Sequence, residues 1–163
     1  MSIYLDNNVV SAMARDDMPS ESEALNRLLA AYSEGRVALV TSEITLREIN
    51  GYQGLMRPQL EQMFEMLKKV PAVSWDDLVG INVQSDKYTM INSPMIHNDP
   101  LYQALLDKGV KTIDAQHVFV AANNTCPAFL TCDGGILSRS TAIEKLFGVV
   151  VQRPSAFVAS QRW

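Results

Sequence analysis

Short runs of β-branched and other apolar residues alternate with stretches of helical periodicity along nearly the whole chain. Strands are expected at residues 3–5, 37–41, 128–131 and 149–152, with a weaker one at 70–74. Apolar residues at helical spacing follow Ser42, Pro58 and Thr112, and a further helix is expected over residues 134–148. Strands that alternate with helices run parallel, because each helix carries the chain back across the sheet. The pattern therefore predicts an α/β fold, a parallel sheet covered by helices on both faces.

Local signals set the expected ends of two helices. Ser20 and Glu23 have the spacing of a capping box and predict the start of a helix that ends at Gly35. Lys68 and Lys69 follow the helix that begins with a proline, and their charges suit its negative C-terminal end. We therefore expect both lysines to belong to the end of that helix.

Composition places the chain in an ordinary class. It has 163 residues, of which 47% are hydrophobic and 20% charged, and this predicts a single domain over residues 1–163. No apolar run approaches the roughly 20 residues that cross a bilayer, so we expect a cytoplasmic protein without a membrane contact. The two cysteines, Cys126 and Cys132, suit small core residues in a reducing compartment. The net charge of -4 argues weakly against nucleic-acid binding by bulk electrostatics.

Acidic residues that are far apart in the sequence are expected to meet at one edge of the sheet. Asp6 directly follows the first strand, and Asp133 follows the strand at 128–131. Asp114 lies near the start of the helix that precedes that strand, and Glu48 lies in the helix after the strand at 37–41. In a doubly wound sheet, these positions all belong to the carboxyl edge, where ligands bind.

Each acid also has a purely structural explanation. Asp6 could form a turn, Asp133 could begin the turn at its two glycines, and Asp114 could be a first-turn acid favoured by the helix dipole. Glu48 could be a solvated helix residue. Together the acids favour a functional interpretation, because crowded carboxylates repel by roughly 4 kcal/mol per pair at 4 Å and an effective dielectric near 20. Such a cluster normally binds a hard divalent cation, and oxygen ligands favour Mg²⁺ or Mn²⁺.

The segments that carry the four acids are similar to known motifs. "IYLDNNVV", "SEITLREI", "TIDAQHVFVAA" and "AFLTCDGGIL" occur in this order and resemble the four acidic motifs of the PIN domain. This family is a metal-dependent nuclease fold shared by VapC-like toxins and several RNA-processing enzymes. The resemblance covers nearly the whole chain and implies a PIN-like three-layer sandwich.

The resemblance also implies roles for individual acids. It implies that Asp6, Asp114 and Asp133 hold the main Mg²⁺ or Mn²⁺ ion, and that Glu48 orients a water molecule or a second ion. The catalytic set would then be these four residues. Asn8 matches the small polar position of the first motif.

Other polar residues are candidates for supporting roles. Thr131 matches the hydroxyl residue before the fourth acid, and with Asn8 it would orient the metal ligands through hydrogen bonds. His117, three residues after Asp114, could be a ligand or a proton shuttle, but a supporting or semi-buried position is favoured. The candidate phosphate contacts are Arg47, Arg15 and Arg139.

The predicted function is a Mg²⁺- or Mn²⁺-dependent endoribonuclease that cleaves the phosphodiester bonds of RNA. The resemblance implies single-stranded or loop RNA as the substrate, the toxin role in a toxin-antitoxin pair, an antitoxin protein as a candidate partner, and a homodimer as a candidate assembly. One alternative is a Mg²⁺-dependent phosphohydrolase of small phosphate esters, which usually needs a lysine that the strand ends here lack. The other is a catalytically silent PIN-like binding module, against which the intact set of acids argues.

Two further expectations concern a loop and the stability of the metal-free protein. The polar stretch from Ile81 to Pro100 is long for a compact domain, and we expect it to lie over or beside the acidic edge. Replacing Asp6 or Asp133 by asparagine would remove one member of a repelling cluster. On that ground alone, the metal-free protein should become more stable.

Overall fold

The computed structural model describes residues 1–15, 17–70 and 99–161. In this part of the chain, five parallel strands form one sheet in the order β3-β2-β1-β4-β5. The strands are β1 (Ser2–Leu5), β2 (Ala38–Thr41), β3 (Lys68–Lys69), β4 (Ala128–Leu130) and β5 (Val150–Gln152). β1 lies at the centre, with Tyr4 paired to Val40 on one side and to Phe129 on the other.

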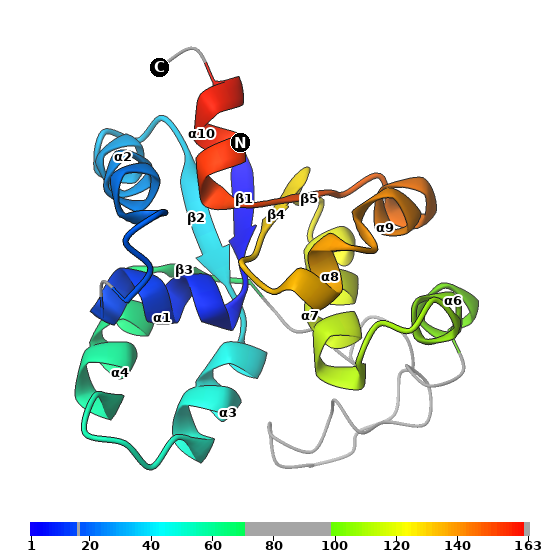
Figure 1. Cartoon of the computed structure of the whole chain (residues 1–163), viewed down its shortest axis with the longest axis horizontal. Helices are drawn as coiled ribbons and strands as arrows, with labels where there is room; N and C mark the ends of the chain where they lie inside the picture. Colours follow the sequence, from blue (N-terminus) through cyan, green and yellow to red (C-terminus); the bar gives the residue numbers. More distant parts are fainter. Residues whose placement is uncertain (16, 71–98, 162–163) are drawn as a thin grey trace, which may run out of the picture.

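Helices pack on both sides of this sheet (Figure 1). The described helices are α1 (Asn7–Arg15), α2 (Ser22–Ser33), α3 (Glu43–Gly51), α4 (Arg57–Met66), α6 (Pro100–Asp107), α7 (Thr112–Asn123), α8 (Gly134–Leu137), α9 (Ser140–Phe147) and α10 (Pro154–Ser160). The predicted fold class, an α/β sandwich with a parallel sheet between helices, is confirmed. None of these helices is both long enough and apolar enough to cross a bilayer.

The alternation of side chains along the strands creates two cores, one on each face of the sheet. Ile3 and Leu5 point to the face covered by α1, α2 and α10, where they share a core with Leu28. Tyr4 points to the opposite face, covered by α6, α7 and α9. There its ring stacks on Phe129, with centroids 5.4 Å apart. The first strand is therefore buried on both faces, as its unbroken apolar sequence requires.

The predicted start of α2 is wrong. The N-cap residue is Glu21, its side chain does not cap the helix, and Ser20 lies in the turn before it. The buried carboxylate of Glu21 instead accepts hydrogen bonds from the backbone N–H and the hydroxyl of Ser155, at 2.8 and 3.0 Å. A contact with the N-terminal turn of α10 thus replaces the local capping box. The predicted end of the helix is confirmed at Gly35, whose φ of +72° suits glycine.

The assignment of Lys68 and Lys69 to a helix end is also wrong. Helix α4 ends at Met66, and the two lysines form β3, which pairs with β2. The described strand β3 lies before the range predicted for this strand, residues 70–74: Val70 is not part of β3, and residues 71–74 lie outside the described residues. Hydrogen bonding to the edge of β2 outweighs the favourable placement of the lysines at a helix end, which is a weak effect at exposed positions.

The helix expected over residues 134–148 consists of two helices. α8 ends at Leu137 and α9 begins at Ser140, with Ser138 and Arg139 between them. The hydroxyl of Ser138 donates to the carbonyl of Gly135 at 2.9 Å, which terminates the short helix. Helix α10 is an element that the sequence pattern did not predict.

The loop predicted to lie near the acidic edge falls almost wholly outside the described residues. Only its last residue and the aspartate before that residue belong to the described part. There Asp99 caps α6, accepting hydrogen bonds from the backbone N–H groups of Leu101 and Tyr102 at 2.8 and 3.1 Å. The position of the loop relative to the acids stays a prediction.

Candidate active site

Asp6 lies at the point where β1 ends and α1 begins. Its side chain is buried, and both carboxylate oxygens accept hydrogen bonds. Oδ1 accepts the backbone N–H of Asn7 at 2.7 Å. Oδ2 accepts the amide of Asn8 at 2.6 Å and the hydroxyl of Thr131 at 2.7 Å. Neighbouring donors therefore hold the carboxylate in one orientation at the carboxyl edge of the central strand.

Asn8 and Thr131 join the end of β1 to the chain that leaves β4. The side-chain Oδ1 of Asn8 accepts the backbone N–H of Cys132 at 2.9 Å, while its side-chain Nδ2 also donates to the Thr131 hydroxyl at 3.0 Å. That hydroxyl accepts the backbone N–H of Asp133 at 3.0 Å. Asn8 and Thr131, two of the three residues that the sequence assigned to supporting roles, thus connect Asp6 with Asp133.

Asp133 is the N-cap residue of α8. Its Oδ1 accepts the backbone N–H groups of Gly135 and Ile136, at 2.5 and 3.3 Å. The sequence left open that Asp133 only begins the turn at its two glycines. One of its two carboxylate oxygens is sufficient for that structural role. Within the described part of the chain, Oδ2 accepts no hydrogen bond, so a cap and a ligand role are compatible.

Glu48 is held by a buried histidine. Oε2 of Glu48 lies 2.9 Å from Nε2 of His117, and a carboxylate can only accept, so Nε2 carries the hydrogen. The other ring nitrogen lies 2.9 Å from the hydroxyl of Tyr4, which lies 2.6 Å from the hydroxyl of Ser42. This chain of contacts links β1, the N-cap of α3, and α7 to a carboxylate at the edge of the pocket.

The electrostatics of the site show unfavourable burial of negative charge. Burial raises the pKa of Asp6, although His117 and the Thr131 hydroxyl oppose the rise. Burial, followed by the charges of Asp6 and Asp133, also raises the pKa of Asp114. Burial acts to lower the pKa of His117, but its hydrogen bond to Glu48 and the surrounding carboxylates leave that pKa above its usual value. The site therefore favours additional positive charge.

One pocket of about 280 Å³ connects these residues. It is lined by the acids Asp6, Glu48, Asp114 and Asp133, together with Asn7, Asn8, Ser11, Arg15 and Met18. The structure thus brings together residues from β1, α1, α3, α7 and α8, as the topology of the carboxyl edge requires. All four predicted acids reach the same pocket.

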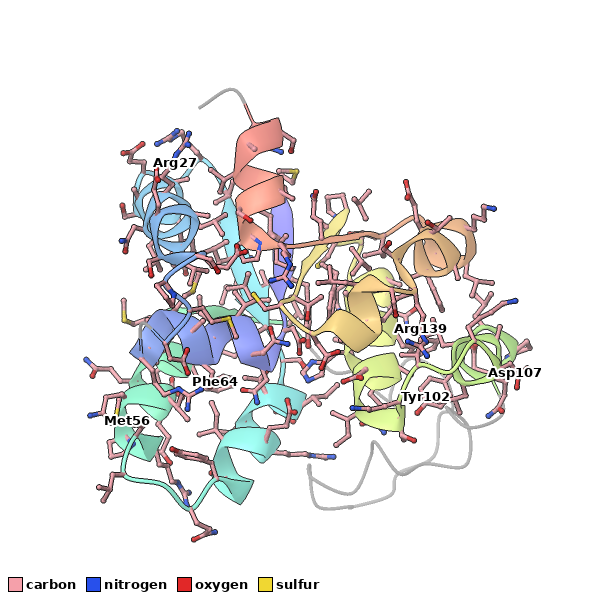
Figure 2. The ribbon with its side chains drawn as sticks, viewed as in Figure 1. Arg27, Met56, Phe64, Tyr102, Asp107 and Arg139 are labelled. Carbon is pink, nitrogen blue, oxygen red and sulfur yellow. The ribbon has the colours of Figure 1, made fainter. Side chains whose placement is uncertain are left out.

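The three predicted phosphate-contacting arginines do not lie together. Arg15 lines the pocket, whereas Arg47 and Arg139 are not among its lining residues. Arg139 extends toward α6 (Figure 2), where its guanidinium donates to the carbonyl oxygens of Lys108 and Gly135 at 2.9 and 2.7 Å. Its contacts join α8 to the turn between α6 and α7.

Comparison with known proteins supports the fold. No protein-family model and no curated protein matches the sequence. A chain in the crystal structure of VapBC2 from Rickettsia felis, bound to a DNA fragment from the promoter, has a similar fold. The match has a TM-score of 0.56 and 12% sequence identity, and it covers 94% of this chain and 98% of that chain. At this identity the likeness shows a shared fold.

The donors in the pocket fit a hard divalent cation in their chemistry. They are oxygens, and the buried Oδ1 of Asn7, which also lines the pocket, has no hydrogen-bond partner among the described residues. Within that part of the chain, however, no three acidic, histidine or cysteine side chains are grouped as in a metal site. The side chains at the rim would have to turn inward to surround one ion.

Sequence reasoning did not identify Tyr4, Ser42, Asn7 or Ser11 as residues of the site. Tyr4 reads as a core residue of a strand, and Ser42 as a helix cap, which it also is. Tyr4 contacts His117 directly and Ser42 contacts Tyr4, and both contacts join segments that are far apart in the sequence, so no local pattern marks these residues. Asn7 and Ser11 carried a usable signal, since they flank Asn8 on the first helix.

Proposed function

We propose that the protein is a Mg²⁺- or Mn²⁺-dependent endoribonuclease that hydrolyses phosphodiester bonds of RNA. One observation carries this proposal: four acids from different elements line one pocket at the carboxyl edge of the sheet, and the deepest is desolvated yet held by hydrogen bonds. A fold that only needed turns and helix caps would not gather these charges at a common pocket.

Asp6, Asp114 and Asp133 would hold the cation. When bound, the cation would offset their charge and stabilise negative charge on the phosphoryl oxygens. Asn8 and Thr131 keep the carboxylate of Asp6 pointed at the site by donating to its Oδ2. These contacts restrict the orientation of a ligand before any cation or substrate arrives.

Glu48 would orient the attacking water and accept its proton. The N–H of His117 fixes Oε2 of Glu48, and the other oxygen, Oε1, would contact the water. Burial raises the pKa of Tyr4, so its hydroxyl stays neutral and holds the far side of the imidazole ring. His117 is thus a positioning residue, because it acts on the reaction through Glu48.

The biological setting is proposed from the resemblance and the structural neighbour. That neighbour belongs to a VapBC2 structure bound to promoter DNA. We propose that this chain is the toxin of a toxin-antitoxin pair, with an antitoxin protein as its partner, in the cytoplasm as a single domain. A homodimer stays a prediction.

The test is cleavage of a single-stranded RNA by the purified protein. We expect cleavage with Mg²⁺ or Mn²⁺ and its loss when the cation is chelated. An Asp114→Asn variant, purified in parallel, controls for a contaminating ribonuclease, since it should be inactive at the same purity. Titration calorimetry with Mg²⁺ reports cation binding independently of activity.

Three results would contradict the proposal. Cleavage that persists in excess chelator would show that the reaction does not need the cation. Hydrolysis of a small phosphate ester such as p-nitrophenyl phosphate, without cleavage of RNA, would favour the phosphohydrolase. Absence of both activities with retained Mg²⁺ binding would favour the silent binding module.

A further inference from the structure

Arg15 differs from the other residues of the pocket because it is the cationic side chain among the described lining residues. Asn8, Ser11 and Arg15 occupy positions i, i+3 and i+7 of one helix, so they share one face of α1. Asp6 directly precedes the N-terminal end of this face, and the backbone of Arg15 lies about 10 Å beyond that of Asn8 along the helix axis. The pocket therefore has an acidic end and a basic end.

The guanidinium of Arg15 does not neutralise the site acids. Its Nη2 lies 2.6 Å from a carboxylate oxygen of Asp17, which is not a lining residue of the pocket. In the described part of the chain, no carboxylate of the acidic end is within ion-pair distance of Arg15. Arg15 thus lines the same pocket as the four acids, but its ion pair is with Asp17 and not with them.

One donor of this guanidinium is buried without an acceptor. Among the described residues, none accepts a hydrogen bond from Nε of Arg15, although this atom is shielded from solvent. A buried N–H without a partner is unfavourable, and a ligand that brings an acceptor oxygen removes the penalty. The hydroxyl of Ser11, which lies one turn earlier on the same face, is available as a second donor.

These observations identify the class of ligand. Guanidinium and hydroxyl groups together suit an anionic oxygen, and a phosphodiester carries two such oxygens. The cation proposed at the acidic end would contact the phosphate that is cleaved. An anion at the basic end is then a different phosphate of the same strand.

We propose that Arg15 and Ser11 bind a phosphate of the RNA strand next to the one that is cleaved, and that Asp17 competes for the same guanidinium. This inference rests on the proposed ribonuclease function. In the free protein, the carboxylate of Asp17 neutralises part of the charge of Arg15. The neighbouring phosphate then binds against this internal competitor.

Steady-state cleavage of a fluorescein-labelled ten-nucleotide RNA tests the subsite. Arg15→Gln should raise KM about ten-fold and leave kcat within about two-fold, because the contact is to a phosphate that does not react. Asp17→Asn should act in the opposite direction and lower KM two- to three-fold, by about the effect of one exposed ion pair. Arg15→Lys should lie between the wild type and Arg15→Gln.

Matched controls come from a second arginine–carboxylate pair. Arg36 and Glu34 are paired at 2.5 Å on the surface and do not line the pocket. Arg36→Gln and Glu34→Gln change the net charge by the same amounts as the two test variants. Both controls should leave KM unchanged, so any difference reports the position of the charge.

Binding anisotropy separates this inference from the proposed function. The same RNA is titrated at several salt concentrations in the Asp133→Asn background, which should not cleave it. One phosphate contact contributes about 0.7 to the slope of log K against log salt for a single strand, and Arg15→Gln should remove that contribution. Arg36→Gln should retain the full slope.

The outcomes distinguish the two ideas. Wild-type protein that does not cleave RNA, but whose salt slope still depends on Arg15, would overturn the proposed ribonuclease and keep the phosphate site. Cleaving protein whose KM and salt slope are the same for Arg15→Gln and Arg36→Gln would overturn the site. A changed Mg²⁺ requirement without a changed KM would overturn it too, since Arg15 would then act on the acids. If Arg15→Gln fails to fold, Asp17→Asn must still lower KM for the site to stand.

Discussion

The bottom and the rim of the acidic pocket differ in how they hold charge. At the bottom, the side chain of Asp6 is 6% exposed, while that of Glu48 at the rim is 29% exposed. Asp6 is fixed by donors from Asn7, Asn8 and Thr131, whereas Glu48 depends on His117. A buried carboxylate needs several donors to stay charged, and a half-exposed one can rely on water.

This difference shows which acids asparagine can replace without loss of stability and which it cannot. Asp133 has one oxygen in a helix cap, a task that asparagine performs equally well. Asp6 has donors against both oxygens, so an amide would place its NH₂ group against another donor. Equal formal charge therefore does not mean equal structural cost.

The largest expected effect separates Asp6→Asn from Asp133→Asn. Both variants should lose cleavage by about 10³-fold, because a metal ligand supports several kcal/mol of transition-state stabilisation. Only Asp6→Asn should also lose stability, by about 1–3 kcal/mol, since a buried donor is left unpaired. Charge repulsion alone predicts that both variants gain stability in the metal-free protein. The hydrogen bonds reverse this prediction for Asp6→Asn and leave it unchanged for Asp133→Asn. Urea unfolding of the metal-free proteins measures the difference.

Equal stability of Asp6→Asn and Asp133→Asn would contradict the difference proposed here between Asp6, at the bottom of the pocket, and the acids at its rim. It would mean that the donors around Asp6 rearrange without cost. A gain in stability for Asp6→Asn would show that relief of charge burial outweighs the mismatched hydrogen bond.

An intermediate effect is expected for His117, which among the described residues is the donor to Glu48. His117→Ala should lower kcat by about 10- to 100-fold, as for other residues that orient a catalytic group. His117→Gln can still donate to Oε2 and should recover part of the loss. In a double-mutant cycle with Glu48→Gln, the two losses should not add, because both remove the same contact.

Additive losses in that cycle would argue that His117 acts independently of Glu48. A purely structural role would lower stability equally in His117→Ala and in the double variant, without a specific loss of kcat. Unfolding curves recorded beside the kinetics distinguish these outcomes.

The smallest expected effect concerns the pH dependence of stability at the rim. The pKa of Asp114 is raised in the folded protein by burial and then by Asp6 and Asp133. A raised pKa in the folded state contributes stability that is fully present below the unfolded value of 3.8 and is lost as pH rises through the folded value. Asp114→Asn should remove this loss, so that the metal-free variant becomes the more stable protein above that range.

The gain for Asp114→Asn should be no more than about 1 kcal/mol, because water screens a half-exposed carboxylate. Saturating Mg²⁺ should stabilise the wild type and close the gap, since a ligand of the folded state raises its stability. Melting curves across pH, with and without Mg²⁺, measure both. A stability difference between the wild type and Asp114→Asn that stays constant with pH would show that the carboxylates at the rim do not repel one another.

The order of elements and the position of the acids were predictable because both are local properties. Strands β1, β2, β4 and β5 follow from runs of apolar residues, and the acids follow strand ends in the sequence. Parallel connectivity then brings strand ends to one edge whatever the side-chain details are. The shared pocket of Asp6, Glu48, Asp114 and Asp133 is a consequence of this topology.

Contacts between distant segments lay beyond prediction from the sequence. The capping box at Ser20 failed because Glu21 found partners on Ser155 of α10. The lysines at the end of α4 became β3 because β2 offered an open edge. In each case, hydrogen bonds available only in the folded chain outweighed a local preference of about 1 kcal/mol.

By itself, therefore, the sequence determined that this chain forms a parallel α/β sandwich with acids at its carboxyl edge. Apolar periodicity and strand-end position suffice for that, because they depend on neighbours along the chain. Only the tertiary structure decided that Asp6 lies buried among donors, that Tyr4 and His117 hold Glu48, and that Arg15 lines the same pocket as the acids while paired to Asp17. Burial and hydrogen-bond partners depend on which segments meet in space. The packing of helices on the two faces of the sheet determines which segments meet.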